Sequence, residues 1–212
     1  LDDSRSSVIG DRSIGDNPDQ VIAIASAFIK GMNQAGMQAT GKHFPGHGGI
    51  FADSHLAFAE DTRPFSELKS HDLLPFNALE LQLGGIMTAH ISFSNIDKEI
   101  ATFSKFWLQD ILRNKMGFAG TIFSDDLSMK SADYVGDIET KVGKALESGC
   151  NMVLVCNDRP AAIRAINFLE KEKISQSQKI TELKASQSIS WTDLEKDTRR
   201  KDIIRKLNTI EK

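Results

Sequence analysis

The chain has 212 residues, a formal net charge of −3 and a sequence pI near 6.0, with 40% hydrophobic and 26% charged residues. This composition is typical of a folded domain and too apolar for a disordered chain. The near-neutral charge argues against nucleic acid as the main partner, because phosphate-binding domains usually carry a basic surplus. No apolar run approaches the roughly 18 residues of a membrane span, so no membrane partner is expected either.

The first third of the chain predicts a helix, a strand and a second helix. Residues 17–36 read as a helix, because Asn17 is a good N-cap, Pro18 suits the first helical position and Gly36 can end the element. A short strand is expected over 39–44, followed by a glycine-rich segment over 45–49. The pattern over 65–83 is helical, and Pro75 is expected to break or kink that helix.

Strands and helices continue to alternate along the rest of the chain. Apolar runs at 85–91, 120–123 and 150–156 predict buried strands, and helical patterns follow at 104–117, 137–149 and 157–169. Strand–helix units in series favour an α/β fold with a parallel sheet covered by helices. Beyond residue 171 we expect a polar linker and one basic amphipathic helix at the C-terminus.

The expected redox state of the two cysteines indicates the cellular compartment of the protein. Cys150 and Cys156 bracket the predicted strand, which would hold their sulfurs about 20 Å apart, whereas a disulfide requires Cα atoms within about 7 Å. Both thiols are therefore expected to be free and buried. Free thiols favour a reducing compartment such as the cytoplasm.

Polar side chains gather where the predicted strands end, which is where parallel α/β folds place their chemistry. These side chains are Lys42, His43, His90, Asp125, Asp126, Asn157 and Asp158. Asp125 is a candidate nucleophile or metal ligand at its strand end, whereas Asp126 is expected to cap the following turn.

A second group of candidates lies between residues 43 and 55. His47, Asp53 and His55 form a chemically suitable ligand set for a metal, but Pro45 and the glycines exclude a helical zinc motif. The alternative is a dyad in which Asp53 orients His55, since residues two apart share a face in an extended segment. Such a histidine can act as a general acid and then as a general base near neutral pH. A plain ion pair within a loop remains open on the residues alone.

Four stretches resemble the bacterial β-N-acetylglucosaminidases of glycoside hydrolase family 3, in the order of that family and at about its spacing. They cover residues 7–12 (SVIGDR), 41–48 (GKHFPGHG), 53–55 (DSH) and 123–129 (FSDDLSM). The resemblance extends from residue 1 to about 170. It implies a (β/α)8 TIM-type barrel, of which this chain would supply the C-terminal part over 1–172, followed by a linker and helix over 173–212. The chain opens without Met and the first barrel strands are missing, so a fragment of a longer enzyme is expected.

The resemblance also implies roles for individual residues. By motif position, Asp125 would be the nucleophile, His55 the acid/base and Asp53 its partner. The sugar hydroxyls would be held by Arg12, Lys42 and His43, whereas His47 would have a structural role. No metal and no cofactor are implied.

The function implied is a retaining exo-β-N-acetylglucosaminidase that removes terminal GlcNAc from peptidoglycan-derived muropeptides during cell-wall recycling in the cytoplasm. Three alternatives stay open. The first is a phosphorylase, in which phosphate replaces water, because a histidine repels phosphate less than a carboxylate does. The others are a non-catalytic carbohydrate-binding protein and a metal-dependent hydrolase.

Overall fold

The computed structural model describes residues 1, 9–50 and 59–210. Its centre is a parallel sheet in the order β1–β3–β5–β6, formed by β1 (Thr40–Phe44), β3 (Gly85–Thr88), β5 (Thr121–Asp126) and β6 (Met152–Leu154). A separate parallel pair joins β2 (Ala59–Glu60) to β4 (Ile91–Ser92). The predicted α/β class with a parallel sheet is confirmed.

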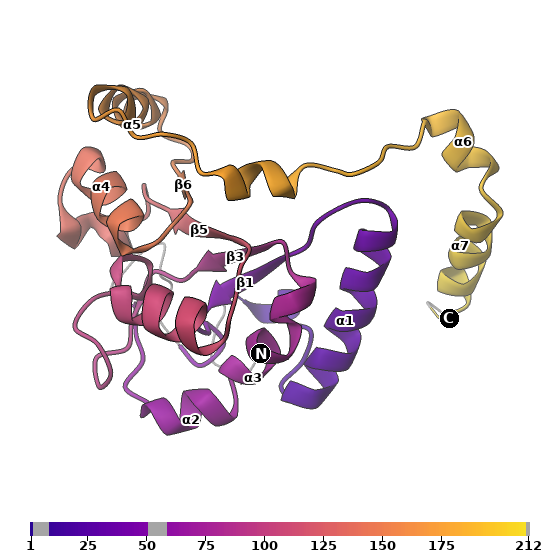
Figure 1. Ribbon diagram of the computed structural model, residues 1–212. Helices are drawn as coiled ribbons and strands as arrows, with labels where there is room; N and C mark the ends of the chain where they lie inside the picture. The colour runs from indigo at the N-terminus through magenta and orange to yellow at the C-terminus, as the bar shows by residue number, and fades with distance from the viewer. Residues whose placement is uncertain (2–8, 51–58, 211–212) are drawn as a thin grey trace.

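Helical segments connect successive strands of the four-stranded sheet, and further helices precede β1 and follow β6 (Figure 1). These are α1 (Pro18–Gln34), α2 (Phe65–Ser70), α3 (Leu73–Leu79), the π-helical segment Phe106–Lys115, α4 (Ile138–Ser148) and α5 (Arg159–Lys171). Short 3-10 turns lie at Gly10–Arg12, Glu80–Gln82, Ala101–Phe103, Lys130–Val135 and Gln178–Leu183. After each of the strands β1, β3 and β5, the chain therefore passes through helical segments before it enters the next parallel strand of this sheet, as a βα repeat requires.

The helix ends follow from side-chain caps. The Asn17 side chain accepts a hydrogen bond from the backbone N–H of Gln20, and Asp137 and Asp158 cap α4 and α5 in the same way. At the other end of α1, Gly36 adopts a φ of +78°, which L side chains rarely adopt. These ends agree with the sequence prediction.

The predicted break at Pro75 lies elsewhere. The helical stretch is interrupted at His71 and Asp72, and Pro75 sits inside the first turn of α3. A proline is tolerated there because the first backbone N–H groups of a helix have no partner to lose. Pro75 therefore lies near the start of the second helix and does not break the first.

The expected buried strand over 150–156 is shorter and more exposed than predicted. β6 covers three residues at one edge of the four-stranded sheet, and Met152 is 37% exposed. Cys150 is buried and free, but Cys156 is free and exposed, so the expectation of two buried thiols is wrong for Cys156. An apolar run predicts a strand without showing whether the strand lies at an edge of the sheet.

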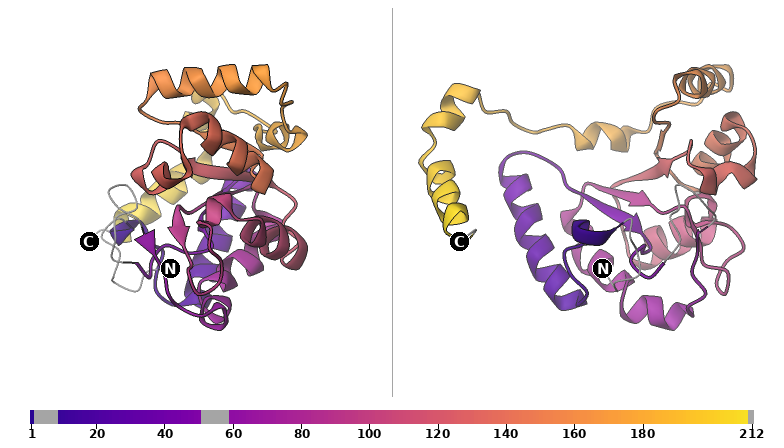
Figure 2. Two further views of the ribbon diagram at one scale, coloured as in Figure 1. Left: turned by 90° about the vertical axis from the view of Figure 1, so that its left-hand side faces the viewer. Right: turned by 180° about the vertical axis from the view of Figure 1, so that it is seen from behind.

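The C-terminal segment holds two helices in place of the single one expected, α6 (Trp191–Lys196) and α7 (Thr198–Ile210), and neither contains a buried residue. The linker from α5 crosses the side of the sheet where the strands begin (Figures 1 and 2). It is attached there, because the Thr121 hydroxyl donates to the Lys179 carbonyl and the Ser186 N–H to the Gly36 carbonyl. Across the described ranges, none of the helices has the length and apolarity that a bilayer crossing would demand.

The aromatic core fixes the end of β1. The fully buried Trp107 packs between Phe44 and Phe93, with ring centroids 6.2 and 5.1 Å away. Burying each such ring contributes about 1.5–3 kcal/mol. Phe44 is the last residue of β1, so this packing holds the strand end that carries Lys42 and His43.

Candidate active site

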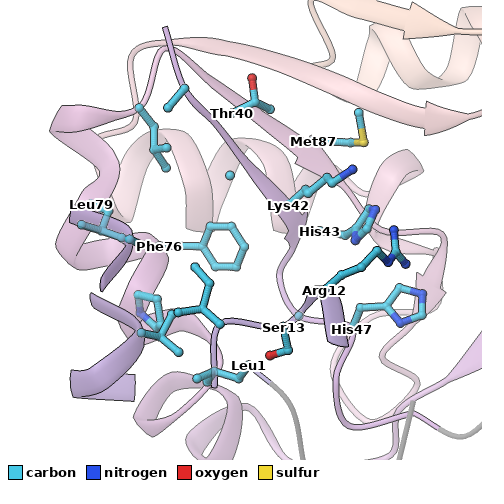
Figure 3. A pocket seen from close by; sticks show the side chains of 18 of the residues that line it. Leu1, Arg12, Ser13, Thr40, Lys42, His43, His47, Phe76, Leu79 and Met87 are labelled. Atoms are coloured by element: carbon cyan, nitrogen blue, oxygen red, sulfur yellow. The ribbon is translucent and has the colours of Figure 1, made fainter. Parts of the chain in front are cut away.

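A cavity of about 750 Å³ lies beside β1. Its polar end is formed by Arg12, Lys42, His43 and His47, which gather on one side in Figure 3. Its other end is apolar, with Phe76 and Leu79 among the lining residues. The cavity thus joins a cationic end, suited to polar ligand groups, to a hydrophobic wall.

Local structure at the end of β1 presents these side chains. The peptide bonds Lys42–His43 and Phe44–Pro45 are cis. Gly46 then packs against Asp72 so closely that a Cβ would lie 2.6 Å from the Asp72 Oδ1 atom. The rings of His43 and His47 lie edge to face, with centroids 5.6 Å apart. His47 therefore lines the cavity, although the sequence favoured a purely structural role for it.

The sheet brings two predicted site residues together. His43 lies near the end of β1 and Asp125 lies near the end of β5, and β3 lies between these strands. The His43 Nε2 atom is 4.0 Å from the Asp125 Oδ2 atom, and the two side chains are only 12% and 16% exposed. The Asp125 carboxylate also accepts a hydrogen bond of 2.8 Å at Oδ1 from the Asp126 N–H.

The surroundings of His43 keep its ring neutral. Burial is the main reason that the pKa of His43 falls to about 4, and the positive charges of Lys42 and Arg12 lower the pKa further. The Asp125 carboxylate opposes this shift without cancelling it. Among the described residues the His43 Nδ1 atom has no hydrogen-bond partner. A neutral ring has one N–H donor and one acceptor nitrogen.

The predicted acid/base pair, Asp53 and His55, lies outside the described residues. The structure does describe both flanks of their segment. On one side Gly46 packs against Asp72. On the other side, the N–H of Asp61 donates to the Ser92 carbonyl over 2.8 Å.

An ion network joins these two flanks. The Arg63 guanidinium donates to Asp61 Oδ2 over 2.7 Å and to Asp72 Oδ2 over 2.9 Å, and the two carboxylates are 3% and 4% exposed. Burial alone would lower the pKa of Arg63, but its hydrogen bonds to Asp61 and Asp72 outweigh burial and raise the pKa. No sequence pattern marks this network, because Asp61 and Arg63 lie before α2 and Asp72 lies after it, and the fold decides that they meet.

Two further strand-end residues serve the fold. His90 is fully buried, with Nδ1 2.8 Å from Thr102 Oγ1 and Nε2 3.0 Å from the Asp126 carbonyl oxygen. The Asp126 carboxylate accepts from the Ser128 N–H over 3.0 Å and from the Cys156 N–H over 2.9 Å. The sequence prediction that Asp126 caps the turn after β5 is confirmed.

Comparison with known proteins identifies the family. The model of the glycosyl hydrolase family 3 N-terminal domain matches residues 1–187. The chain belongs to this family. A beta-hexosaminidase of Idiomarina loihiensis is 46% identical over 199 residues, which cover 93% of this chain and 60% of that protein. NagZ from Neisseria gonorrhoeae, solved in complex with N-trifluoroacetyl-D-glucosamine, is 40% identical with a TM-score of 0.75 and covers 86% of this chain and 51% of that one.

The chain therefore spans between half and two-thirds of the length of these relatives. Its fold is a partial TIM-barrel-like α/β fold, in which the parallel sheet and its helices cover only part of the relatives' structure. The resemblance inferred from the four sequence motifs is confirmed.

The metal alternative has no support within the described residues, where no group of three or more His, Cys, Asp or Glu side chains could hold an ion. Two of its three proposed ligands, Asp53 and His55, lie outside those residues. NagZ from N. gonorrhoeae has also been solved in complex with a zinc ion, with 36% identity and a TM-score of 0.76 over 89% of this chain and 54% of that one. A chelator therefore belongs in any assay of the activity.

Proposed function

We propose that the protein is a retaining exo-β-N-acetylglucosaminidase that removes terminal GlcNAc from peptidoglycan-derived muropeptides in cytoplasmic cell-wall recycling. The observation that carries this proposal is the 4.0 Å distance between the Asp125 carboxylate and His43, whose ring lines the cavity, in a chain whose relatives are named beta-hexosaminidases. The buried, free thiol of Cys150 supports a reducing compartment.

The reaction takes two steps. The Asp125 carboxylate attacks the anomeric carbon, a covalent glycosyl–enzyme bond forms and the bond to the leaving oxygen breaks, while His55 donates its proton to that oxygen. His55 then removes a proton from water, which attacks the anomeric carbon and releases Asp125 with its electron pair. Asp53 orients His55 and raises the basicity of its ring, so that the neutral ring left after the first step can take a proton from water in the second.

The remaining cavity residues hold the sugar. Arg12 and Lys42 carry charged donors, which make the stronger kind of hydrogen bond to hydroxyl groups. His43, kept neutral by burial, offers one donor and one acceptor without placing a further positive charge beside Asp125. These contacts orient the pyranose so that its anomeric carbon faces the carboxylate.

The test is hydrolysis of a chromogenic β-GlcNAc glycoside by the full-length gene product, with Asp125→Ala, His55→Ala and Asp137→Ala beside it. Asp137 is an exposed helix cap far from the cavity chemistry and serves as the matched control. We expect turnover that collapses in the first two variants and persists in the third.

Added phosphate and a chelator separate the alternatives. Sugar-1-phosphate formed in phosphate buffer would make the enzyme a phosphorylase, and loss of turnover with chelator would make it a metal-dependent hydrolase. GlcNAc binding by the folded protein without any turnover would overturn the catalytic proposal in favour of a binding role.

A further inference from the structure

His90 lies outside the cavity lining, yet it contacts the strand end that carries Asp125. It follows β3 and its ring stacks on Phe103, with centroids 5.9 Å apart and planes 9° from parallel. The Nε2 atom lies 3.0 Å from the carbonyl oxygen of Asp126, and Nδ1 lies 2.8 Å from Thr102 Oγ1. Both ring nitrogens are therefore engaged by the fold.

The chemistry of these partners decides which nitrogen carries the proton. Burial is the main reason that the pKa of His90 is lowered, so the ring is neutral and has a single N–H. A carbonyl oxygen only accepts, so Nε2–H donates to Asp126 and Nδ1 is the acceptor that faces the Thr102 hydroxyl. Thr102 Oγ1 shares its single proton between Nδ1 and the Ala89 carbonyl, to which it donates over 3.1 Å, and it lies 2.7 Å from Thr88 Oγ1. Thr88 can donate to Thr102 in turn, which completes the chain.

The end of β5 needs such a contact. The pairing of β3 with β5 ends at Met87 and Phe123, two residues before Asp125. Beyond that point Asp126 pairs with Leu154 of β6, after a shift in register. The His90 side chain thus supplies a hydrogen bond to β5 from the β3 side, past the last backbone pair.

The Asp126 backbone is linked directly to the Asp125 carboxylate. Its N–H donates to Asp125 Oδ1 over 2.8 Å, while its carbonyl accepts from His90. The N–H and the carbonyl belong to neighbouring peptide planes that meet at the Asp126 Cα, so a displacement of this Cα moves both contacts. A fixed Asp126 backbone therefore helps to hold the orientation of the Asp125 carboxylate.

We propose that His90 is a positioning residue for Asp125, acting through the hydrogen bond from its Nε2–H to the Asp126 carbonyl. The proposal rests on the nucleophilic role proposed for Asp125. On this proposal, the residues that support the reaction include the buried pair Thr88 and Thr102, which hydrogen-bond to each other and to His90.

The test compares His90→Gln with His90→Asn in the full-length gene product. Glutamine can bring an amide N–H to the Asp126 carbonyl, whereas asparagine is one methylene shorter and does not reach it. We expect His90→Asn to lower kcat on an aryl β-GlcNAc glycoside about 10–100-fold, because small misplacements of a reacting group cost that much. His90→Gln should keep kcat within about threefold, and the inhibition constant of GlcNAc should stay within about twofold in both.

A second readout does not depend on turnover. The amide proton of Asp126 should move upfield in the NMR spectrum of His90→Asn, as its bond to Asp125 lengthens, and stay in place in His90→Gln. If His90→Asn does not fold, the pair Thr102→Val and Thr102→Ser asks the same question, with slow turnover expected for the valine variant alone.

Equal losses in the glutamine and asparagine variants, a loss confined to KM, or an unmoved Asp126 amide in His90→Asn would overturn the proposal. Absence of turnover in the wild-type protein would overturn the proposed function instead. In that case the NMR shift of the Asp126 amide proton would still show whether His90 holds the end of β5.

Discussion

His43 and His90 lie at the ends of neighbouring strands of one sheet, yet their environments are opposite. His43 borders the cavity, 4.0 Å from Asp125, and its Nδ1 atom has no hydrogen-bond partner among the described residues. His90 is fully buried, and both of its ring nitrogens have partners within 3.0 Å. The His43 ring lines the cavity and can contact a ligand there, whereas both ring nitrogens of His90 are bonded within the fold.

The position of the strands explains this difference. β1 is at the edge of the described four-stranded sheet and beside the cavity, whereas β3 lies between β1 and β5. A polar side chain after a central strand is covered on both sides and must find partners in the protein. His43, near the end of β1, keeps one side toward the cavity.

The largest expected effect concerns Arg63, which, like His90, has its polar atoms bonded within the protein. Its partly buried guanidinium pairs with two buried carboxylates. Arg63→Met leaves the buried carboxylates of Asp61 and Asp72 without their cation, so the free energy of unfolding should fall by about 3–5 kcal/mol. Urea denaturation measures the change. Glu67→Gln is the matched control, because Glu67 is half exposed and 3.6 Å from Arg63, and it should cost less than about 0.5 kcal/mol. Similar losses in both variants would contradict the buried network.

The two histidines should respond in opposite ways to removal. His90→Ala leaves the Thr102 hydroxyl and the Asp126 carbonyl without a partner and opens a cavity, which should lower the free energy of unfolding by about 2–3 kcal/mol. His43→Ala removes a ring whose Nδ1 has no partner among the described residues, so it should cost less stability, about 1 kcal/mol, while lowering kcat/KM about 100-fold through lost sugar contacts. Denaturation and steady-state kinetics on both variants check this, and equal destabilisation would erase the contrast.

The burial of His43 should also make the stability of the protein depend on pH, with a smaller effect than Arg63→Met or His90→Ala. The pKa of His43 is lowered from 6.5 to about 4, chiefly by burial. Between these values the unfolded ring binds a proton that the folded ring does not, so stability falls as the pH falls through this window. The loss should be about 2 kcal/mol, since solvent in the open cavity screens part of the shift. Urea midpoints at several pH values, with His43→Gln as the non-titrating variant, measure it; identical pH slopes would contradict it.

The smallest expected effect comes from the difference in burial between the two thiols, Cys150 and Cys156. Burial raises the pKa of Cys150 to about 12, despite the opposing charge of Arg113. Cys156 is exposed. A thiol reagent near pH 8 should therefore label Cys156 in the native protein and Cys150 only after unfolding, as read by mass spectrometry, with Cys156→Ser as the control. Native labelling of Cys150 would contradict its burial.

Much of the fold could be predicted because its determinants are local. Caps at Asn17 and Gly36, and the alternation of apolar strands with amphipathic helices, are read within a few residues. The errors arose where the outcome depends on distant neighbours. Met152 and Cys156 are exposed because β6 is an edge strand, and no pattern within residues 150–156 encodes that.

The candidate site divides in the same way. The motifs located Lys42, His43 and Asp125, and the sheet brings two of these to 4.0 Å. The pattern of polar residues at strand ends could not separate His90 from His43, because the difference lies in what covers each ring. Arg63 and Asp72 likewise escaped notice, since their contact depends on how α3 packs beside Gly46.

The role of Asp125 is tested most directly by trapping the covalent intermediate. A fluorinated GlcNAc derivative with a good leaving group should form the glycosyl–enzyme faster than water releases it. Peptide mass mapping of the full-length gene product should then place one sugar on the peptide that contains Asp125, with fragmentation locating it on that residue, and Asp125→Asn should remain unlabelled. Labelling at another residue, or labelling that persists in Asp125→Asn, would contradict the assignment of Asp125 as the nucleophile.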